Sequence, residues 1–357
     1  MPNAEPRWWL RLEHEASSCP ACESPRVTLL DVLSIPKSPD GNRVAFLAGC
    51  RACGLLFANP RPRQDELYRY YLPDGPWAAP RAERMRKIEA VDARWQRSKK
   101  PRPKAALPRK SRCLFDALAA HVPVYAPPPG AKILDFGCGD GKFLNRFQDC
   151  GWVTHGIEPS TSAAFSRHAR LTSPPQDASF DFVFLNHVLE HVDAPLALLR
   201  QLANALREGG VLFVSVPRLD TLPAHGDLDY CISGRRHVMC FSETCLRGLL
   251  GRAGFTTAGR LDAHELDAVF TEGKPLRLRL VAVRTRSPDP LPDAPLSPAV
   301  KALARYVRGW EGVATRVRRL LPVRVRGGLL NRAAARRILE RRQGLVGSPG
   351  RQGAGGE

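Results

Sequence analysis

Short apolar runs alternate with amphipathic segments between residues 113 and 285, and this alternation is the clearest pattern in the chain. The apolar runs, which we expect to form strands, lie at 131–136, 152–157, 180–185, 211–216 and 276–283. The amphipathic segments, which we expect to form helices, lie at 111–120, 141–150, 160–170, 195–206 and 242–252. Strands that alternate with helices are typical of a parallel sheet covered on both faces. The pattern therefore predicts a doubly wound α/β domain over residues 113–285.

The segments on either side of this domain differ from it in composition. Residues 1–75 contain four of the ten cysteines in two close pairs, which predicts a separate N-terminal module. Residues 76–112 are rich in Arg, Lys and Pro and are expected to form a basic connector. Residues 286–357 begin with a Pro-rich linker and continue as a basic tail whose apolar residues recur at three- and four-residue steps. This tail is predicted to be a basic amphipathic helix, which either packs on the domain or lies on a membrane surface.

The formal net charge of +19 resides in these appendages. Residues 81–112 carry thirteen basic and three acidic side chains, and residues 298–351 carry fourteen and two. The α/β domain carries seventeen and eighteen, so the high overall charge is weak evidence for a polyanionic substrate. The N-terminus lacks an apolar signal segment, and no apolar run reaches the roughly 18–20 residues that span a bilayer. We therefore expect a cytoplasmic protein, at most peripheral to the inner membrane face, whose cysteines are metal ligands or buried thiols.

A glycine-rich turn follows the first predicted strand of the domain, in the segment KILDFGCGDG at 132–141. Gly137 and Gly139 allow the backbone to approach a ligand where a side chain would collide, although such turns also occur for structural reasons alone. Glu158 stands at the end of the next predicted strand, where a carboxylate can accept hydrogen bonds from ribose hydroxyls. The two features together predict a nucleotide-containing ligand.

The turn has the form D-x-G-C-G-x-G, which differs from the G-x-G-x-x-G dinucleotide spacing. Here the sequence resembles class I S-adenosylmethionine-dependent methyltransferases. The matching segments, in the order of that family, are LDFGCGDGKFL, GIEPS, FDFVFLNHVLEHV, LREGGVLFVSVP and HVMCFSETCLRGLLGRAGF. The resemblance covers residues 111–285. It implies a Rossmann-like, seven-stranded sheet with helices on both faces and a reversed final strand.

The resemblance also assigns cofactor-binding residues. The residues that it places around the cofactor are Asp135, Gly137, Cys138 and Gly139 beside the methionine part, Glu158 at the ribose, and Asn186 and His187 after the fourth strand. Only nine residues, 171–179, separate the second predicted helix from the fourth strand, where the family has a whole third strand. We therefore expect a shortened or absent third strand, with Asp177 as the polar candidate near the adenine.

Two C-x2-C pairs lie 27 residues apart in the N-terminal module, at Cys19 and Cys22 and at Cys50 and Cys53. Two such pairs supply a closed set of four thiolates, which suits a structural zinc better than a catalytic one. A redox pair or four unrelated thiols are the alternatives.

The chain resembles one subset of these methyltransferases in a second respect. Members of the subset carry an N-terminal zinc-ribbon-like module that ends in a segment like CRACGLLFANPRP followed by tyrosines. The tyrosines here are Tyr68, Tyr70 and Tyr71. The subset includes sugar C-methyltransferases and others encoded with cell-surface glycan enzymes, in which the module covers the substrate site and can contribute a tyrosine. The resemblance makes Tyr71 a catalytic candidate, and ordinary packing is the alternative for each tyrosine.

His237 is the candidate proton acceptor, because it precedes a predicted helix on the substrate side in the segment RRHVMCFS. Arg236 stands where the sugar C-methyltransferases have a glutamate, and with Arg235 it can bind a phosphate or carboxylate instead. A histidine that caps or packs at a helix start is the alternative. The motif NHVLEH at 186–191 resembles a metal site in its spacing, but it also matches the strand-end pattern of the family, and we favour that interpretation without a metal.

These patterns predict an enzyme that transfers a methyl group from S-adenosylmethionine to a small polar acceptor, such as a nucleotide- or lipid-linked sugar. One alternative is an RNA methyltransferase whose cysteine module and basic connector bind phosphates, although the domain is neutral and lacks a base-stacking aromatic pattern. The other is a non-catalytic scaffold with a methyltransferase fold. The predicted cofactors are S-adenosylmethionine and a structural zinc ion.

Overall fold

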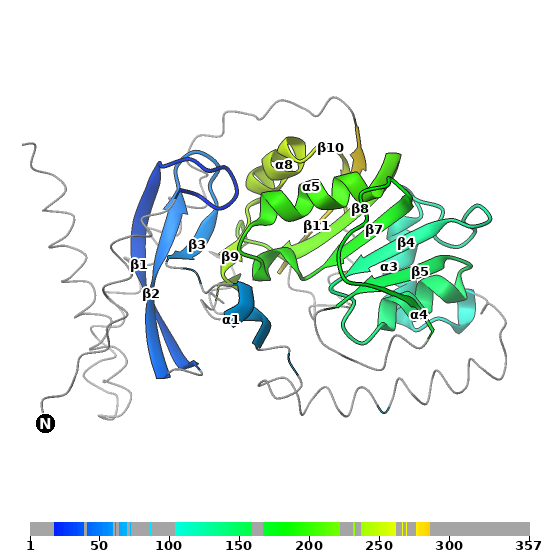
Figure 1. Ribbon diagram of the computed structural model, residues 1–357, viewed down its shortest axis with the longest axis horizontal. Coiled ribbons are helices and arrows are strands. Elements are labelled where there is room, and N and C mark those ends of the chain that lie inside the picture. The colour runs from blue at the N-terminus through cyan, green and yellow to red at the C-terminus, as the bar shows by residue number, and fades with distance from the viewer. Residues whose placement is uncertain are drawn as a thin grey trace, which may run out of the picture.

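The protein is represented by a computed structural model, shown in Figure 1. The residues that it describes are 18–38, 41–59, 61, 64–69, 72, 86, 104–158, 167–221, 231–232, 237–261, 266, 269 and 276–285. Most of the predicted connector and the whole of 286–357 lie outside the described residues, so the basic tail and its helix stay predictions. Within the described part, no helix is both long enough and apolar enough to cross a membrane.

The α/β domain is built on a sheet in which seven strands can be followed within the described residues. Their order is β10-β11-β8-β7-β4-β5-β6. Their bounds are Phe255–Arg260 (β10), Arg277–Arg284 (β11), Leu206–Pro217 (β8), Phe180–Asn186 (β7), Lys132–Phe136 (β4), Val153–Ile157 (β5) and Ala169–Leu171 (β6). Strands β8, β7, β4, β5 and β6 pair in parallel, whereas β11 is antiparallel to both of its neighbours. This arrangement confirms the predicted doubly wound sheet with one reversed strand.

Helices cover both faces of this sheet (Figure 1). Helices α5 (Pro195–Ala205) and α8 (Glu243–Arg252) lie on one face, and α3 (Arg109–Leu118) and α4 (Lys142–Asp149) on the other. Strand β7 is apolar along most of its length because both of its faces are buried. Val183 and Leu185 pack on the first face of the sheet, and Phe182 and Phe184 pack on the second.

Three predicted elements differ from the observed ones. The helix expected at 160–170 does not reach its predicted end, because Ala169–Leu171 pairs in parallel with β5 as the edge strand β6. Strand β6 therefore takes the place of the third strand and is three residues long, which confirms the predicted shortening. Leu206, predicted as the last residue of the helix at 195–206, is instead the first residue of β8, because α5 ends at Ala205. The strand predicted at 276–283 is observed as β11, and beside it β10 forms an edge strand that was not predicted.

A second sheet joins the N-terminal module to the α/β domain (Figure 1). It consists of β1 (Val27–Ser38), β2 (Gly41–Cys50), β3 (Leu56–Asn59) and β9 (Met239–Cys240), and β9 comes from the α/β part of the chain. Strand β3 pairs antiparallel with β9. Buried residues of both parts, such as Leu55, Phe57, Phe241 and Leu246, belong to one hydrophobic core. The module is thus packed onto the domain near the carboxyl ends of its strands, and short helix α1 (Gln64–Arg69) follows it.

Candidate functional site

The glycine loop after β4 has the backbone geometry that the sequence predicted. Gly137 and Gly139 have φ values of +75° and +55°, in the left-handed region that favours glycine. A Cβ at Gly137 would lie 2.5 Å from Cγ2 of Val188, so packing also requires glycine there. A Cβ at Gly139 would meet no atom within 4 Å, so the loop is open on that side. One glycine is required by the protein interior, and the other leaves space for a ligand.

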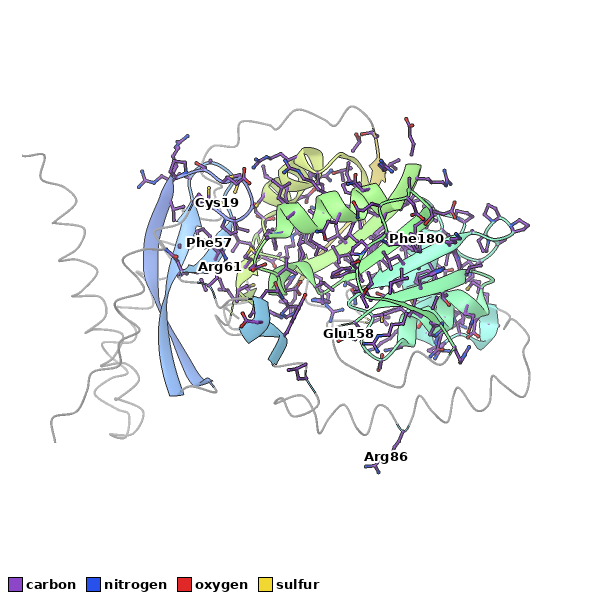
Figure 2. All side chains as sticks on the ribbon, viewed as in Figure 1. Cys19, Phe57, Arg61, Arg86, Glu158 and Phe180 are labelled. Atoms are coloured by element: carbon purple, nitrogen blue, oxygen red, sulfur yellow. The ribbon has the colours of Figure 1, made fainter. Side chains whose placement is uncertain are left out.

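Glu158 holds the outer part of this loop. It follows β5 directly, and its Oε2 accepts a hydrogen bond of 2.9 Å from the backbone N–H of Gly139. The backbone N–H groups of Gly137 and Cys138 donate to the carbonyl of Ile157, at 2.8 and 3.2 Å. The loop and the end of β5 therefore form one unit, with the Glu158 carboxylate at the edge of the sheet that faces α1 (Figure 2).

The floor of the site carries a second carboxylate. Asp135 is 3% exposed, and burial raises its pKa well above the usual range, as do the nearby carboxylates of Glu158 and Asp140. Burial, followed by the charges of Asp135 and Glu158, also raises the pKa of the Cys138 thiol, which therefore stays protonated. Two carboxylates so close together favour a positively charged ligand, because a cation stabilises their ionised forms.

The end of β7 adds Asn186 and His187 to the same edge of the sheet, because β7 pairs with β4. His187 has a φ of +57°, an uncommon conformation for a residue with a side chain. Its backbone N–H donates to the carbonyl of Ser215, and its Nδ1 lies 2.8 Å from Oε1 of Glu190. Asp177, by contrast, is exposed and precedes the amino end of β7, so the structure does not bring this predicted adenine contact to the other cofactor candidates.

A group of three side chains, here called the histidine cluster, lies just beyond β7. It consists of Glu190 and His191 in the short helix η4 (Leu189–His191) and of His237 just before β9. One potential ligand atom from each lies within 4.8 Å of the others. Burial alone would raise the pKa of Glu190, but the charges of His187, His191 and His237 outweigh it and lower that pKa to about 2. The predicted base His237 is thus next to a fully buried carboxylate, a contact that the sequence did not reveal.

Helix α1 brings a tyrosine to this region. Burial raises the pKa of the Tyr68 hydroxyl, and the charges of Asp193 and Glu158 raise it further, which places this tyrosine near the Glu158 carboxylate. The side-chain oxygen of Gln64 accepts a hydrogen bond of 3.0 Å from the backbone N–H of Asp193, so α1 is attached to the segment after η4. The catalytic candidate Tyr71 lies outside the described residues, as do Arg235 and Arg236.

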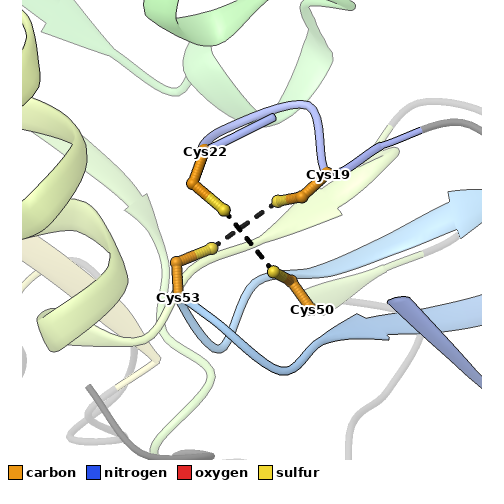
Figure 3. Close-up of side chains that lie close together, drawn as sticks. All are labelled: Cys19, Cys22, Cys50 and Cys53. Atoms are coloured by element: carbon orange, nitrogen blue, oxygen red, sulfur yellow. Dashed lines mark hydrogen bonds between the residues drawn. The ribbon is translucent and has the colours of Figure 1, made fainter. Parts of the chain in front are cut away.

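The four predicted metal ligands converge in the N-terminal module and form what we call the four-cysteine cluster (Figure 3). The Sγ atoms of Cys19 and Cys53, and those of Cys22 and Cys50, are 3.5 Å apart. A Zn–S distance of about 2.3 Å places the sulfurs of a tetrahedral site roughly 3.8 Å apart, so the cluster fits a zinc ion closely. Sequence reasoning missed Cys245 of α8, whose Sγ lies 3.9 Å from that of Cys53, because no local motif links residues so distant in the chain.

Known proteins are similar to the α/β part of the chain. Residues 109–258 match the family model described as "Methyltransferase domain". A tRNA U34 carboxymethyltransferase of Syntrophotalea carbinolica is 32% identical over 161 residues, which cover 38% of this chain and 48% of that protein. A ubiquinone biosynthesis O-methyltransferase of Xanthomonas campestris is 33% identical over 126 residues, which cover 31% of this chain and 50% of that protein. The chain thus spans about half the length of these curated relatives.

Solved structures are also similar to part of the chain. One of them is an S-adenosylmethionine-dependent methyltransferase from Mesorhizobium loti, with 22% sequence identity and a TM-score of 0.39. The similarity covers 48% of this chain and 98% of that one. The family match and the curated relatives support a methyltransferase domain of the class I, S-adenosylmethionine-dependent kind over residues 109–258. The family match does not extend to the four-cysteine cluster.

Proposed function

We propose that this chain transfers the methyl group of S-adenosylmethionine to a small polar acceptor, such as a nucleotide- or lipid-linked sugar, in the cytoplasm. The observation that carries the proposal is the joined loop and carboxylate, in which Glu158 holds the N–H of Gly139 beside open space. This arrangement lies within the residues that match the methyltransferase family.

The residues present fit S-adenosylmethionine, which supplies an activated methyl group bonded to a positively charged sulfur. Glu158 would accept hydrogen bonds from the ribose hydroxyls, because an ionised carboxylate accepts several hydrogen bonds at once. Asp135 would lie beside the positively charged methionine part, since it is a buried carboxylate at the base of the loop. The protein then mainly positions the acceptor for an in-line displacement and excludes water.

The acceptor is proposed to enter between the loop and the N-terminal module. Tyr68 is near Glu158, and α1 is hydrogen-bonded to the segment that follows the histidine cluster. The module therefore contributes side chains to the acceptor side, while a structural zinc ion in the four-cysteine cluster would stabilise its fold.

Calorimetric titration with S-adenosylmethionine and with its demethylated product tests the cofactor assignment. Glu158→Gln keeps an oxygen for the Gly139 N–H but removes the charge, so we expect affinity to fall roughly 10–100-fold, the equivalent of one charged hydrogen bond. Glu208→Gln makes the same chemical change at an exposed position at the start of β8 and should bind like the wild type. Absence of binding in the wild type, or equal affinities in all three proteins, would refute the proposal.

RNA methylation is the second candidate, favoured by the tRNA-directed relative and by the excess of basic residues at 81–112. Counterion release makes RNA binding weaken steeply with salt. Fluorescence-anisotropy titration of short RNAs at two salt concentrations distinguishes the candidates. Tight binding with a steep salt slope would favour RNA, whereas weak binding at all salts would favour the small acceptor.

A further inference from the structure

We propose that Glu190, His191 and His237 bind one divalent cation, and that this cation receives a hydroxyl oxygen of the methyl acceptor. The binding of the cation stands on the geometry of the histidine cluster alone. The role in orienting an acceptor rests on the proposed function. The two parts are therefore tested by separate measurements.

The ligand set has the composition and spacing of an open metal site. A carboxylate oxygen and two imidazole nitrogens lie within 4.8 Å of one another, and Nε2 of His191 is 3.9 Å from Oε1 of Glu190. Small side-chain rotations bring such atoms to a common ion. Two histidines and one carboxylate leave coordination positions for water or substrate, unlike the closed set of the four-cysteine cluster.

The backbone holds the three ligands in place. Glu190 and His191 are consecutive in η4, directly after β7. The backbone N–H of Val238 donates to the carbonyl of Glu190 at 2.9 Å, which ties the residue after His237 to the first ligand. The rings of His191 and His237 meet edge to face with their centroids 4.8 Å apart. A metal site needs this kind of support, because ligands on rigid elements keep their geometry.

Glu190 supplies the second, independent observation that indicates a ligand. Its side chain is 0% exposed, and its Oε2 has no hydrogen-bond partner among the described residues. A buried carboxylate is costly unless charge or hydrogen bonds satisfy both oxygens. Oε1 is already held by Nδ1 of His187 at 2.8 Å. An ion bound within the cluster would satisfy the carboxylate.

His187 therefore acts as the partner that orients the ligating carboxylate, a common arrangement around metal sites. The spacing of NHVLEH alone suggests His187, Glu190 and His191 as the ligand set, although the motif also matches the strand-end pattern of the family. The structure replaces His187 by His237, which is distant in sequence, and so restores a metal site with a different third ligand.

The cation gives the acceptor a defined chemistry. Coordination lowers the pKa of a hydroxyl, so its proton can pass to water near neutral pH. The oxygen then forms a bond to the methyl carbon while the carbon–sulfur bond of the cofactor breaks, and the electron pair stays on sulfur. His237 is a ligand in this scheme rather than the proton acceptor. The acceptor is accordingly an alcohol, and the product a methyl ether.

Mn²⁺ is the probe for the cation, because it favours nitrogen and oxygen ligands over the thiolates of the four-cysteine cluster. Loss of the free Mn²⁺ signal in electron paramagnetic resonance should show one bound ion per full-length chain. His237→Ala should weaken binding at least tenfold, and His237→Asp, which restores a ligand oxygen, should recover part of the loss. His121→Ala, in the turn after α3, is the matched control and should bind Mn²⁺ like the wild type. No bound ion, or equal binding in His237→Ala and the control, would overturn the proposal.

Water-proton relaxation of the same samples tests the open position. At least one exchangeable water on the bound Mn²⁺ is expected, and a fully closed ion would overturn the role in holding the acceptor. Affinity for S-adenosylmethionine, measured on the wild type and on His237→Ala, should be the same. Because that affinity depends on Glu158, failure of the proposed function would appear there while Mn²⁺ binding persisted.

Discussion

Gly137 and Gly139 of the cofactor loop have different roles. Alanine at Gly137 should mainly lower stability, and alanine at Gly139 should mainly lower cofactor affinity. Both have positive φ, and the left-handed region costs a residue with a side chain roughly 1–2 kcal/mol. At Gly137 the new methyl group would also lie 2.5 Å from Cγ2 of Val188, and overpacking of this kind costs about 1–3 kcal/mol more. We therefore expect Gly137→Ala to lower the free energy of unfolding by about 2–5 kcal/mol and Gly139→Ala by about 1–2 kcal/mol.

Cofactor affinity should show the reverse order. The methyl group of Gly139→Ala would enter the open space beside Glu158, where the ligand backbone contact is proposed, and should weaken binding by at least about tenfold. Folded Gly137→Ala should bind better than Gly139→Ala, because its methyl group faces the interior. Urea denaturation gives the free energies and calorimetry the affinities.

A double variant isolates the collision. Val188→Ala removes the Cγ2 atom, so Gly137→Ala should cost less in that background than in the wild type, with a coupling of roughly 0.5–3 kcal/mol. The reasoning is refuted if both glycine variants are equally destabilised, if the coupling is absent, or if Gly139→Ala binds the cofactor like the wild type.

The remaining predictions concern a buried histidine and the four-cysteine cluster. Burial, then the charge of Arg167, lowers the pKa of His168 from 6.5 to about 4, so the folded state holds fewer protons than the unfolded state between these values. Stability is complete above pH 6.5 and should fall by about 3 kcal/mol as the pH drops to about 4, a dependence that His168→Gln should flatten in urea titrations. Elemental analysis should find one zinc ion per chain in the wild type and none in Cys53→Ser. Cys245→Ala should keep the zinc ion, because Cys245 is a neighbour of the cluster rather than a ligand. Retention of zinc in Cys53→Ser would contradict this assignment.

The features that the sequence predicted correctly are those encoded by adjacent residues. A strand, a glycine turn and a helix follow one another within 132–149, so Gly137, Gly139 and the position of Glu158 could be identified from local spacing. Each C-x2-C pair is also a local feature, whereas the convergence of the two pairs depends on the antiparallel pairing of β1 with β2. The glycine turn and each single pair depend on backbone geometry that short motifs determine.

The features that the sequence did not reveal depend on contacts between distant segments. The segment at 160–170 has an amphipathic pattern, yet pairing with β5 makes Ala169–Leu171 a strand. No motif joins His237 to Glu190, or Cys245 to Cys53, because the two residues of each pair are distant in sequence and meet only in the folded chain. Asp177 looked suitable as an adenine contact from its order in the chain, but the return from β6 to the start of β7 carries it away from the carboxyl ends of the strands.

The pairing of β3 with β9 gives the N-terminal module a direct effect on the acceptor side. Cys50 and Cys53 precede β3, Phe57 of β3 pairs with Met239, and Met239 is two residues beyond His237. The backbone N–H of Val238 donates to Glu190, so the same short segment is held by the module on one side and by the histidine cluster on the other. Distortion of the four-cysteine cluster would therefore displace His237 before it reached Glu158, which is fixed by the glycine loop. Changes in the module should accordingly lower the rate of methyl transfer to the acceptor more than the affinity for the cofactor. A module that only stabilised the fold would lower both together.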